Sequence, residues 1–291
     1  GFDILGFAVG ALGDRVTVTR TAGPGVAIRA VRGVVQDISR EARDNTAGRA
    51  LLALQEALRP DCGFAVEIDK GIPLGSGLGG SAASAVAAVV AANALLPNPC
   101  TQLELLKFAM AGEAVASGGQ HVDNIAASLF GGLVLTVGID HPRVKQIPVP
   151  AAIRAVIVHP HMFLATARAR AILKGSVELS DFVWQTANLA GFISGCYTND
   201  LDMIRASLED VVIEPQRQAL IPGFQEVRRA AMQAGALGCS ISGAGPAMFA
   251  WTTLATAPAV LSTMQQEFAQ RQLRSDAWCV EVNAVGARVL P

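Results

Sequence analysis

The chain has few charged and few aromatic side chains. Charged residues make up 16% of its 291 residues and aromatic residues 5%, with a single tyrosine. A globular domain carries roughly 25% charged residues, and scarce aromatics argue against a stacking platform for single-stranded nucleic acid. The 23 basic and 24 acidic residues give a formal net charge of −1, so no overall field attracts nucleic acid or an anionic membrane. We therefore expect no nucleic-acid partner, and any anion site must be built locally.

Long apolar runs and paired cysteines are also missing. The most apolar stretch, residues 82–96, is mostly alanine and is interrupted by Ser84 and Asn93. A membrane span needs about 20 strongly apolar residues, so we expect a buried helix there and no membrane association. The five cysteines are scattered and contain no C-x-x-C pair, which predicts reduced thiols and a cytoplasmic location. The chain opens without Met and without a leader pattern, so we predict no signal peptide and expect residues upstream of Gly1.

The pattern of apolar residues predicts an α+β protein with two domains. Just over half of the residues, 51%, are hydrophobic, and this length fits one large domain or two ordinary ones. Alternating or β-branched segments predict strands, whereas helical spacing predicts helices, and the two mix without regular βαβ order. The Pro-bearing stretch 139–150 is the best boundary, which gives domains of residues 1–150 and 151–291. Strands are expected near residues 15–21, 25–31, 64–69, 133–137, 153–159, 239–241, 247–251 and 278–283. Helices are expected near residues 45–57, 82–96, 103–116, 124–130, 183–197, 200–210, 223–234 and 267–273.

The strongest motif is Pro-Leu-Gly-Ser-Gly-Leu-Gly-Gly-Ser-Ala-Ala-Ser, at residues 73–84, between a predicted strand and the alanine-rich helix. Glycines without a Cβ let the backbone approach a ligand closely. The helix that follows directs its free N–H groups and the positive end of its dipole at this loop. The pattern therefore predicts a phosphate-binding site. The residues expected to surround the phosphates are Pro73, Gly75, Ser76, Gly77, Leu78, Gly79, Gly80, Ser81, Ala82 and Ser84.

Two common phosphate-binding motifs do not fit this loop. Gly75-x-Gly77-x-x-Gly80 matches the dinucleotide pattern in letters, but residues 70–74, with a proline, separate it from the strand. A Walker A loop needs Lys and then Ser or Thr after its last glycine, whereas Ser81 and Ala82 follow Gly80. A glycine-rich turn that binds nothing remains the alternative. Without a phosphate-loop lysine, the negative charge of a nucleotide must be compensated mainly by backbone amides and a metal ion.

Three further segments carry polar side chains beside apolar structure. Ser81 offers a hydroxyl and Glu113 a carboxylate to Mg²⁺, although a partly exposed helix acid is the alternative for Glu113. The segment 117–124 precedes an apolar helix and suits either a helix cap or a ligand contact. A second small-residue loop at 239–246 is either a tight turn or a partner of the first loop. His159-Pro-His161 has no third ligand nearby, so we interpret it as structural.

The order of these motifs resembles the GHMP small-molecule kinases, which include galacto-, homoserine, mevalonate and phosphomevalonate kinases. The matching segments are residues 73–84, Glu113, residues 121–124 and residues 240–246. Further segments are similar to the homoserine kinases of this family in particular, namely residues 1–6, residues 121–124 with 130–132, and residues 166–173, 214–217 and 221–224. The resemblance implies an N-terminal domain like domain 2 of ribosomal protein S5, a ferredoxin-like C-terminal domain, ATP and Mg²⁺ as cofactors, and a homodimer.

The resemblance also implies a reaction, the transfer of the ATP γ-phosphoryl group to the hydroxyl of L-homoserine on the route to threonine. On this interpretation Ser81 and Glu113 hold Mg²⁺, and Asn45 lies in the region that borders the adenine. Asp3 would bind the substrate amino group, and Arg170 with Arg217 its carboxylate. The remaining residues expected near the substrate are His121, Asn124 and Gly243, and the candidate catalytic residues are His121, Asp123 and Asn124.

The resemblance predicts catalysis without a strong base. Mevalonate-type relatives use an Asp as general base, whereas this chain has Asn124 at the comparable place, and an amide does not accept a proton usefully. Phosphoryl transfer passes through a loose transition state, so positioning and charge stabilisation can supply most of the rate.

The chain departs from the family pattern in places, and two alternative functions stay open. Gly80 replaces a common Ser, and Ala244 and Ala247 stand where Ser and Thr are frequent. One alternative is a kinase of the same fold for another alcohol, either a sugar or a mevalonate-pathway compound; the arginine pair argues against a sugar, which has no carboxylate. The other is a regulator that binds ATP or a metabolite without catalysis; the two potential metal ligands argue against it.

Overall fold

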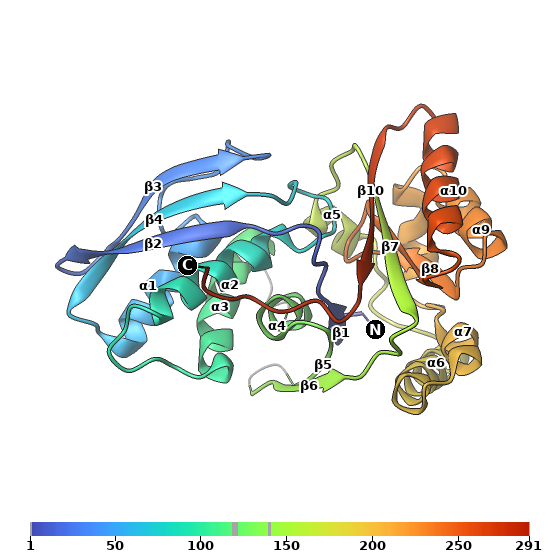
Figure 1. Cartoon of the computed structure of the whole chain (residues 1–291), viewed down its shortest axis with the longest axis horizontal. Coiled ribbons are helices and arrows are strands. Elements are labelled where there is room, and N and C mark those ends of the chain that lie inside the picture. Colours follow the sequence, from blue (N-terminus) through green and yellow to red (C-terminus); the bar gives the residue numbers. More distant parts are fainter. Residues whose placement is uncertain (1, 118–121, 139–140, 291) are drawn as a thin grey trace.

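The computed structural model describes residues 2–117, 122–138 and 141–290, and the strands of this part form three sheets (Figure 1). Helices and strands mix without a repeating βαβ order, so the predicted α+β class is confirmed. None of the helices in these residues combines the length and the apolar character that a membrane span requires.

The first sheet has the strand order β2-β4-β3, with β4 antiparallel to β2 and parallel to β3. Alternate residues of β4, Phe64, Val66 and Ile68, are buried against the helices, because successive side chains of a strand point to opposite faces. The fully buried alanines of α2 allow neighbouring helices to pack closely around it. The elements of this part are β2 (Arg15–Ala22), β3 (Val26–Gly33), α1 (Thr46–Leu58), β4 (Cys62–Lys70), α2 (Gly80–Asn93), α3 (Gln102–Ser117) and α4 (Val122–Phe130).

The other two sheets are antiparallel. The second has the order β1-β5-β6, and its strands are β1 (Leu5–Phe7), β5 (Leu133–Val137) and β6 (Arg143–Ile147). The third has the order β10-β7-β9-β8, and its strands are β7 (Ile153–Pro160), β8 (Gly238–Ile241), β9 (Met248–Thr253) and β10 (Ser275–Glu281). The helices of this half are α5 (Thr166–Ala171), α6 (Leu179–Thr198), α7 (Leu201–Ser207), α8 (Glu214–Arg217), α9 (Phe224–Gln233) and α10 (Ala257–Gln270).

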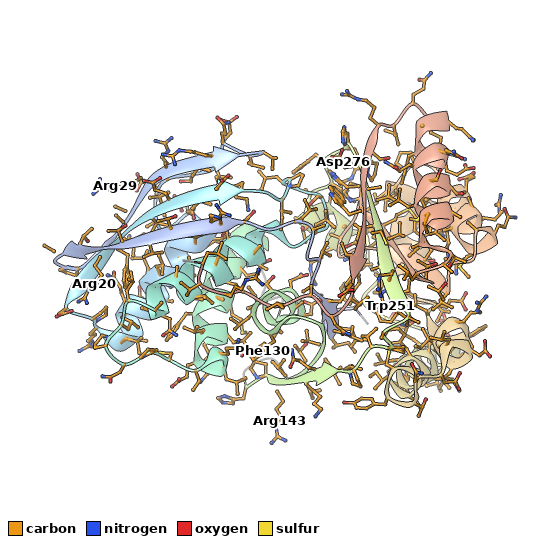
Figure 2. The ribbon with its side chains drawn as sticks, viewed as in Figure 1. Arg20, Arg29, Phe130, Arg143, Trp251 and Asp276 are labelled. Carbon is orange, nitrogen blue, oxygen red and sulfur yellow. The ribbon has the colours of Figure 1, made fainter. Side chains whose placement is uncertain are left out.

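The third sheet is covered on both faces (Figure 1). One face packs on α9 and α10 through Val156 and Val158, and the other packs on α6 and α7 through Ile157. On this second face the ring of Trp251 lies 5.0 Å from that of Phe192 and 6.1 Å from that of Phe7 in β1, and Figure 2 shows Trp251 in the interior near β1. One apolar core therefore joins the second sheet to the third, with residues on both sides of position 150.

The described elements match most of the expected helices and strands, and the differences are local. The stretch 139–150, expected to be a boundary, contains β6, and the division at residue 150 stays a proposal. Helix α10 starts at Ala257 rather than near residue 267, because Pro258 lies in its first turn, where the missing N–H costs nothing. Four short elements, β1, β6, α5 and α8, were not predicted from the sequence.

Candidate active site

A cavity of about 640 Å³ lies between the start of α2 and the third sheet. The chain's first residues, the glycine-rich loop, α3, α4, α5, α8 and the turn between β8 and β9 all contribute to its lining. The cavity thus brings together residues that are far apart in sequence. Its lining contains these predicted site residues: Asp3, Pro73, Gly75, Ser76, Gly77, Leu78, Gly79, Gly80, Ser81, Glu113, Asp123, Asn124, Arg170, Arg217 and Gly243.

The glycine-rich loop has a backbone that only glycine adopts easily. Gly75, Gly77 and Gly79 have φ values of 61°, 80° and 71°, in the left-handed region. A Cβ on Gly77 would also lie 2.4 Å from the carbonyl oxygen of Ser242, a separation that atoms do not tolerate. The glycines are therefore required both by the loop's conformation and by its close contact with the β8–β9 turn.

Hydrogen bonds join the two glycine-rich loops directly. The hydroxyl Oγ of Ser242 donates to the carbonyl oxygen of Gly77 at 2.9 Å, and the backbone N–H of Ala247 donates to that of Ser76 at 3.0 Å. A Cβ on Gly243 would lie 2.9 Å from the same Gly77 oxygen. The two loops are thus in direct contact, as expected if the second loop is a partner of the first.

The start of α2 has the features of an anion site. Its N-cap is Gly79, no side chain caps it, and its first turn contains no acidic residue. The first N–H groups of a helix have no partner within the helix and carry the positive end of its dipole. Ser81 lies in this first turn, and Glu113 of α3 is buried beside the same cavity. Asn124 of α4 is close as well, with its Oδ1 3.8 Å from the position of a Cβ on Gly79.

The cavity lining also contains two arginines, Arg170 and Arg217. Arg170 donates from Nη2 to both carboxylate oxygens of Asp3, at 2.7 and 2.9 Å. Arg217 is buried and donates to the carbonyl oxygens of Ala169 at 3.0 Å and Gly243 at 3.1 Å. The ring of Phe2 lies 5.2 Å from the Cζ of Arg170 and 4.9 Å from that of Arg217, within cation–π range.

The like charges of Arg170 and Arg217 favour a bound anion. Burial, and then the neighbouring Arg170, lower the pKa of the Arg217 guanidinium below its ordinary value. Among the described residues, no hydrogen-bond acceptor reaches the buried Nε of Arg170. A carboxylate placed here would satisfy that donor and reduce the repulsion between the two guanidinium groups.

Several predicted residues lie elsewhere. Asn45 is the N-cap of α1, where its Oδ1 accepts from the N–H groups of Ala47 and Gly48, and it does not line the cavity. Ala82 and Ser84 are buried on α2, also away from the cavity lining. His121 lies outside the described residues.

The His159-Pro-His161 segment has a structural setting. His159 is buried, and His161 lies 2.9 Å from Asp276 on the neighbouring strand. Within the described ranges, no group of three or more His, Cys, Asp or Glu side chains is arranged to hold a metal ion.

The sequence analysis assigned no role to Glu214, which also lines the cavity. The Oγ of Ser240 donates to its carboxylate, and the Nε of Arg228 lies 3.4 Å from it. Burial raises the pKa of Glu214 above its ordinary value, although Ser240 and Arg228 both act to lower it. The only sequence signal was its place in the Glu-Pro-Gln-Arg segment that carries part of the family resemblance.

Comparison with known proteins agrees with this architecture. Residues 45–132 match the family model of the GHMP kinases N terminal domain, and residues 192–270 match that of the GHMP kinases C terminal. Homoserine kinase from Xanthomonas campestris pv. campestris is 49% identical over all of this chain and 89% of its own length. The crystal structure of homoserine kinase from Cytophaga hutchinsonii is 43% identical and superposes with a TM-score of 0.96, covering all of this chain and 92% of that one.

A more distant structure shares the fold. Mevalonate kinase from L. major, in complex with R-mevalonate, is 17% identical, with a TM-score of 0.69 over 94% of this chain and 87% of that one. The resemblance expected from the motifs is confirmed by these full-length matches. The chain is an ATP-dependent kinase that belongs to the GHMP kinase family, in which it groups with the homoserine kinases.

Proposed function

We propose that this kinase transfers the γ-phosphoryl group of ATP to the side-chain hydroxyl of L-homoserine, which yields O-phospho-L-homoserine for threonine biosynthesis. The observation that carries the proposal is the Asp3–Arg170 pair, which lines the same cavity as Arg217 and the start of α2. This arrangement complements the amino group and the carboxylate of an α-amino acid. We place the reaction in the cytoplasm, in keeping with five cysteines, all within the described residues, that form no disulfide.

Binding of the amino acid is an exchange of ionic partners. The substrate's ammonium group replaces Arg170 beside Asp3, and its carboxylate replaces Asp3 beside Arg170. The Nε of Arg170 then gains the acceptor that it lacks among the described residues. Arg217 is held by Ala169 and Gly243, so its guanidinium is already oriented before the carboxylate binds.

The nucleotide phosphates bind at the glycine-rich loop and at the first turn of α2, whose first backbone N–H groups have no partner within the helix. Ser81 and Glu113 are suited to Mg²⁺, which takes one or two protein oxygens together with phosphate oxygens and water. Both residues line the cavity, and Glu113 is 5% exposed. A Mg²⁺ ion held by these two side chains would supply neutralisation of the charge on the phosphate oxygens. On this proposal Asn45 does not contact the adenine itself; it caps α1, and so stabilises the region expected to border the adenine.

Asn124 orients the acceptor hydroxyl in this proposal, and no residue acts as a strong base. We expect Asn124→Asp to retain at least about a tenth of kcat, and Asp123→Asn to lose far less than the 10²- to 10⁴-fold that general base catalysis contributes. Steady-state kinetics on variants with native circular dichroism test this. An Asp123→Asn enzyme that folds normally and does not turn over would show that Asp123 is the base. His121 is assigned to the hydroxyl end by family resemblance alone.

The substrate is tested by an ADP-release assay with Mg·ATP. We expect the highest kcat/KM with L-homoserine among six alcohols: L-homoserine, D-homoserine, L-serine, L-threonine, mevalonate and galactose. Turnover of only mevalonate or galactose would support a kinase of this fold but would contradict the roles given to Asp3, Arg170 and Arg217. Binding of ATP without turnover of any of the six alcohols would favour the alternative function, a regulator that binds ATP without catalysis.

We also propose that the chain forms a homodimer through the outer face of α6. Large apolar side chains are exposed there, among them Leu179 at 75%, Val183 at 59% and Tyr197 at 50%. The helix carries a single charged residue, Asp181. Exposed apolar patches are typical of interaction sites, and a twofold axis places the same face of both copies in contact. Sedimentation equilibrium is expected to give twice 30.2 kDa, and a monomer at micromolar concentration would contradict it.

A further inference from the structure

We propose that a buried ion pair, Lys70 with Asp14, holds both ends of the glycine-rich loop and thereby positions it for the nucleotide phosphates. Lys70 is the last residue of β4, and Asp14 directly precedes β2. Both are positioning residues, because the hydrogen bonds of the two side chains go to the ends of the loop and to each other. The proposal rests on the assignment of this loop to phosphate binding.

Asp14 fixes the point where the chain enters the loop. Its Oδ1 accepts hydrogen bonds from the backbone N–H groups of Gly71 at 3.0 Å and Ile72 at 3.2 Å. Its Oδ2 accepts from the Oγ of Ser84 at 2.6 Å and from the Nζ of Lys70. One carboxylate thus joins the end of β4 to the second turn of α2.

Lys70 fixes the point where the chain leaves the loop. Its Nζ donates to the carbonyl oxygen of Gly80, the first residue of α2, at 2.8 Å. It also donates to the Oγ of Ser84 at 2.9 Å and to Asp14. The three donors of the ammonium group therefore have three acceptors, and two of these lie on α2.

This way of anchoring leaves the anion site available. A side-chain N-cap would occupy one of the first N–H groups of α2, and α2 has none. Lys70 instead binds α2 through a carbonyl oxygen, so the N–H groups that face the cavity stay available for phosphate. The three left-handed glycines make the loop intrinsically flexible, and restraint at Ile72 and Gly80 limits that freedom.

Stability alone does not account for this pair. Lys70 is 3% exposed and the Asp14 side chain 0%. Burying two charges costs desolvation energy, and apolar residues of similar size often stabilise a fold equally well or better. Positioning, in contrast, requires directional bonds from one centre to both ends of the loop, which apolar side chains do not form.

The experiment compares Lys70→Met, Asp14→Asn and the double variant. Each single variant leaves one buried charge unpaired, so we expect a lower Tm; the double variant removes both charges and should recover Tm. Displacement of reacting groups by about 1 Å can cost 10²-fold in rate, so we expect kcat/KM for Mg·ATP to fall about 10- to 100-fold in all three. The KM for the amino acid should stay within about threefold of the wild-type value, because Arg170 and Arg217 do not contact this pair.

Two controls make the outcome decisive. Leu54 of α1 is fully buried in the apolar core and does not line the cavity, so Leu54→Ala should lower Tm and leave the KM for ATP unchanged. Ser84→Ala keeps both charges and removes the hydroxyl that bridges them. It replaces the Lys70 variants as the test if those do not fold, and we expect it to lower kcat/KM for Mg·ATP by a smaller factor. Wild-type ATP kinetics in the double variant, or in Ser84→Ala when the others do not fold, would overturn the proposal.

The nucleotide site is also measured without the acceptor alcohol. Titration calorimetry with a non-hydrolysable Mg·ATP analogue should show weaker binding by the double variant than by wild type. If wild-type protein binds the analogue but does not phosphorylate L-homoserine, the substrate assignment fails while the positioning proposal stands. Equal analogue affinity of the double variant and the wild type would overturn the positioning proposal.

Discussion

Arg170→Ala is expected to lower kcat/KM for L-homoserine by about 10- to 150-fold, with little change in the KM for ATP. A hydrogen bond to a charged group contributes about 1.5–3 kcal/mol, and each 1.4 kcal/mol corresponds to a factor of ten. The variant also leaves Asp3 without the partner that it has in the structure. Arg170→Lys should recover only part of the loss, because an ammonium group lacks the planar fork that pairs with both carboxylate oxygens.

A substrate without a carboxylate separates this role from a general defect. 3-Amino-1-propanol carries the ammonium and hydroxyl groups of homoserine but has no carboxylate for Arg170 to bind. The variant and the wild-type enzyme should therefore phosphorylate it with similar, low efficiency. Loss of activity toward both alcohols in equal proportion would show that Arg170 maintains the structure of the site and does not recognise the carboxylate.

Glu113→Gln is expected to lower kcat by about 10²- to 10³-fold, the range found when one preorganised charge-stabilising group is removed from an active site. The amide keeps the size of the side chain but is a poorer ligand for Mg²⁺ than a carboxylate. The Mg²⁺ concentration that gives half-maximal rate should rise, and part of kcat should return at high Mg²⁺.

Glu104→Gln is the matched control, because it makes the same change on the same helix. Glu104 is exposed at the start of α3, where it accepts hydrogen bonds from Thr101 and lies away from the cavity lining. It should keep the wild-type kcat and Mg²⁺ dependence. A Glu113→Gln enzyme with an unchanged Mg²⁺ dependence would remove Glu113 from the metal site.

The glycine-rich loop and the regular elements were predictable because their signals are local. The spacing of glycines before an alanine-rich helix indicated an anion site, and the alternation of residues 64–69 indicated β4. The three-residue strand β1 was not predictable, because its partner lies far along the chain, with Leu5 opposite Leu135. An edge element of this length has too few residues to show a period.

The roles of the buried polar residues Asn45, Lys70 and Asp14 could not be predicted from the sequence. Asn45 fits a position near a nucleotide as well as it fits a helix cap, and only the bonds to Ala47 and Gly48 show that it caps α1. Lys70 and Asp14 carry no motif, and a lysine at the end of a strand is ordinarily exposed. Their pairing depends on how two strands and α2 come together, which no local pattern specifies.

The contact between the two glycine-rich loops has a thermodynamic consequence. Arg217 donates to the carbonyl oxygen of Gly243, and the adjacent Ser242 donates to that of Gly77. A carboxylate that binds Arg217 therefore affects Gly243, whose neighbour Ser242 is hydrogen-bonded to the glycine-rich loop. Where two sites are coupled, each ligand changes the affinity of the other by the same factor. If binding at the two sites is coupled, the short turn between β8 and β9 is the element that would transmit it, because it contacts both Arg217 and the glycine-rich loop.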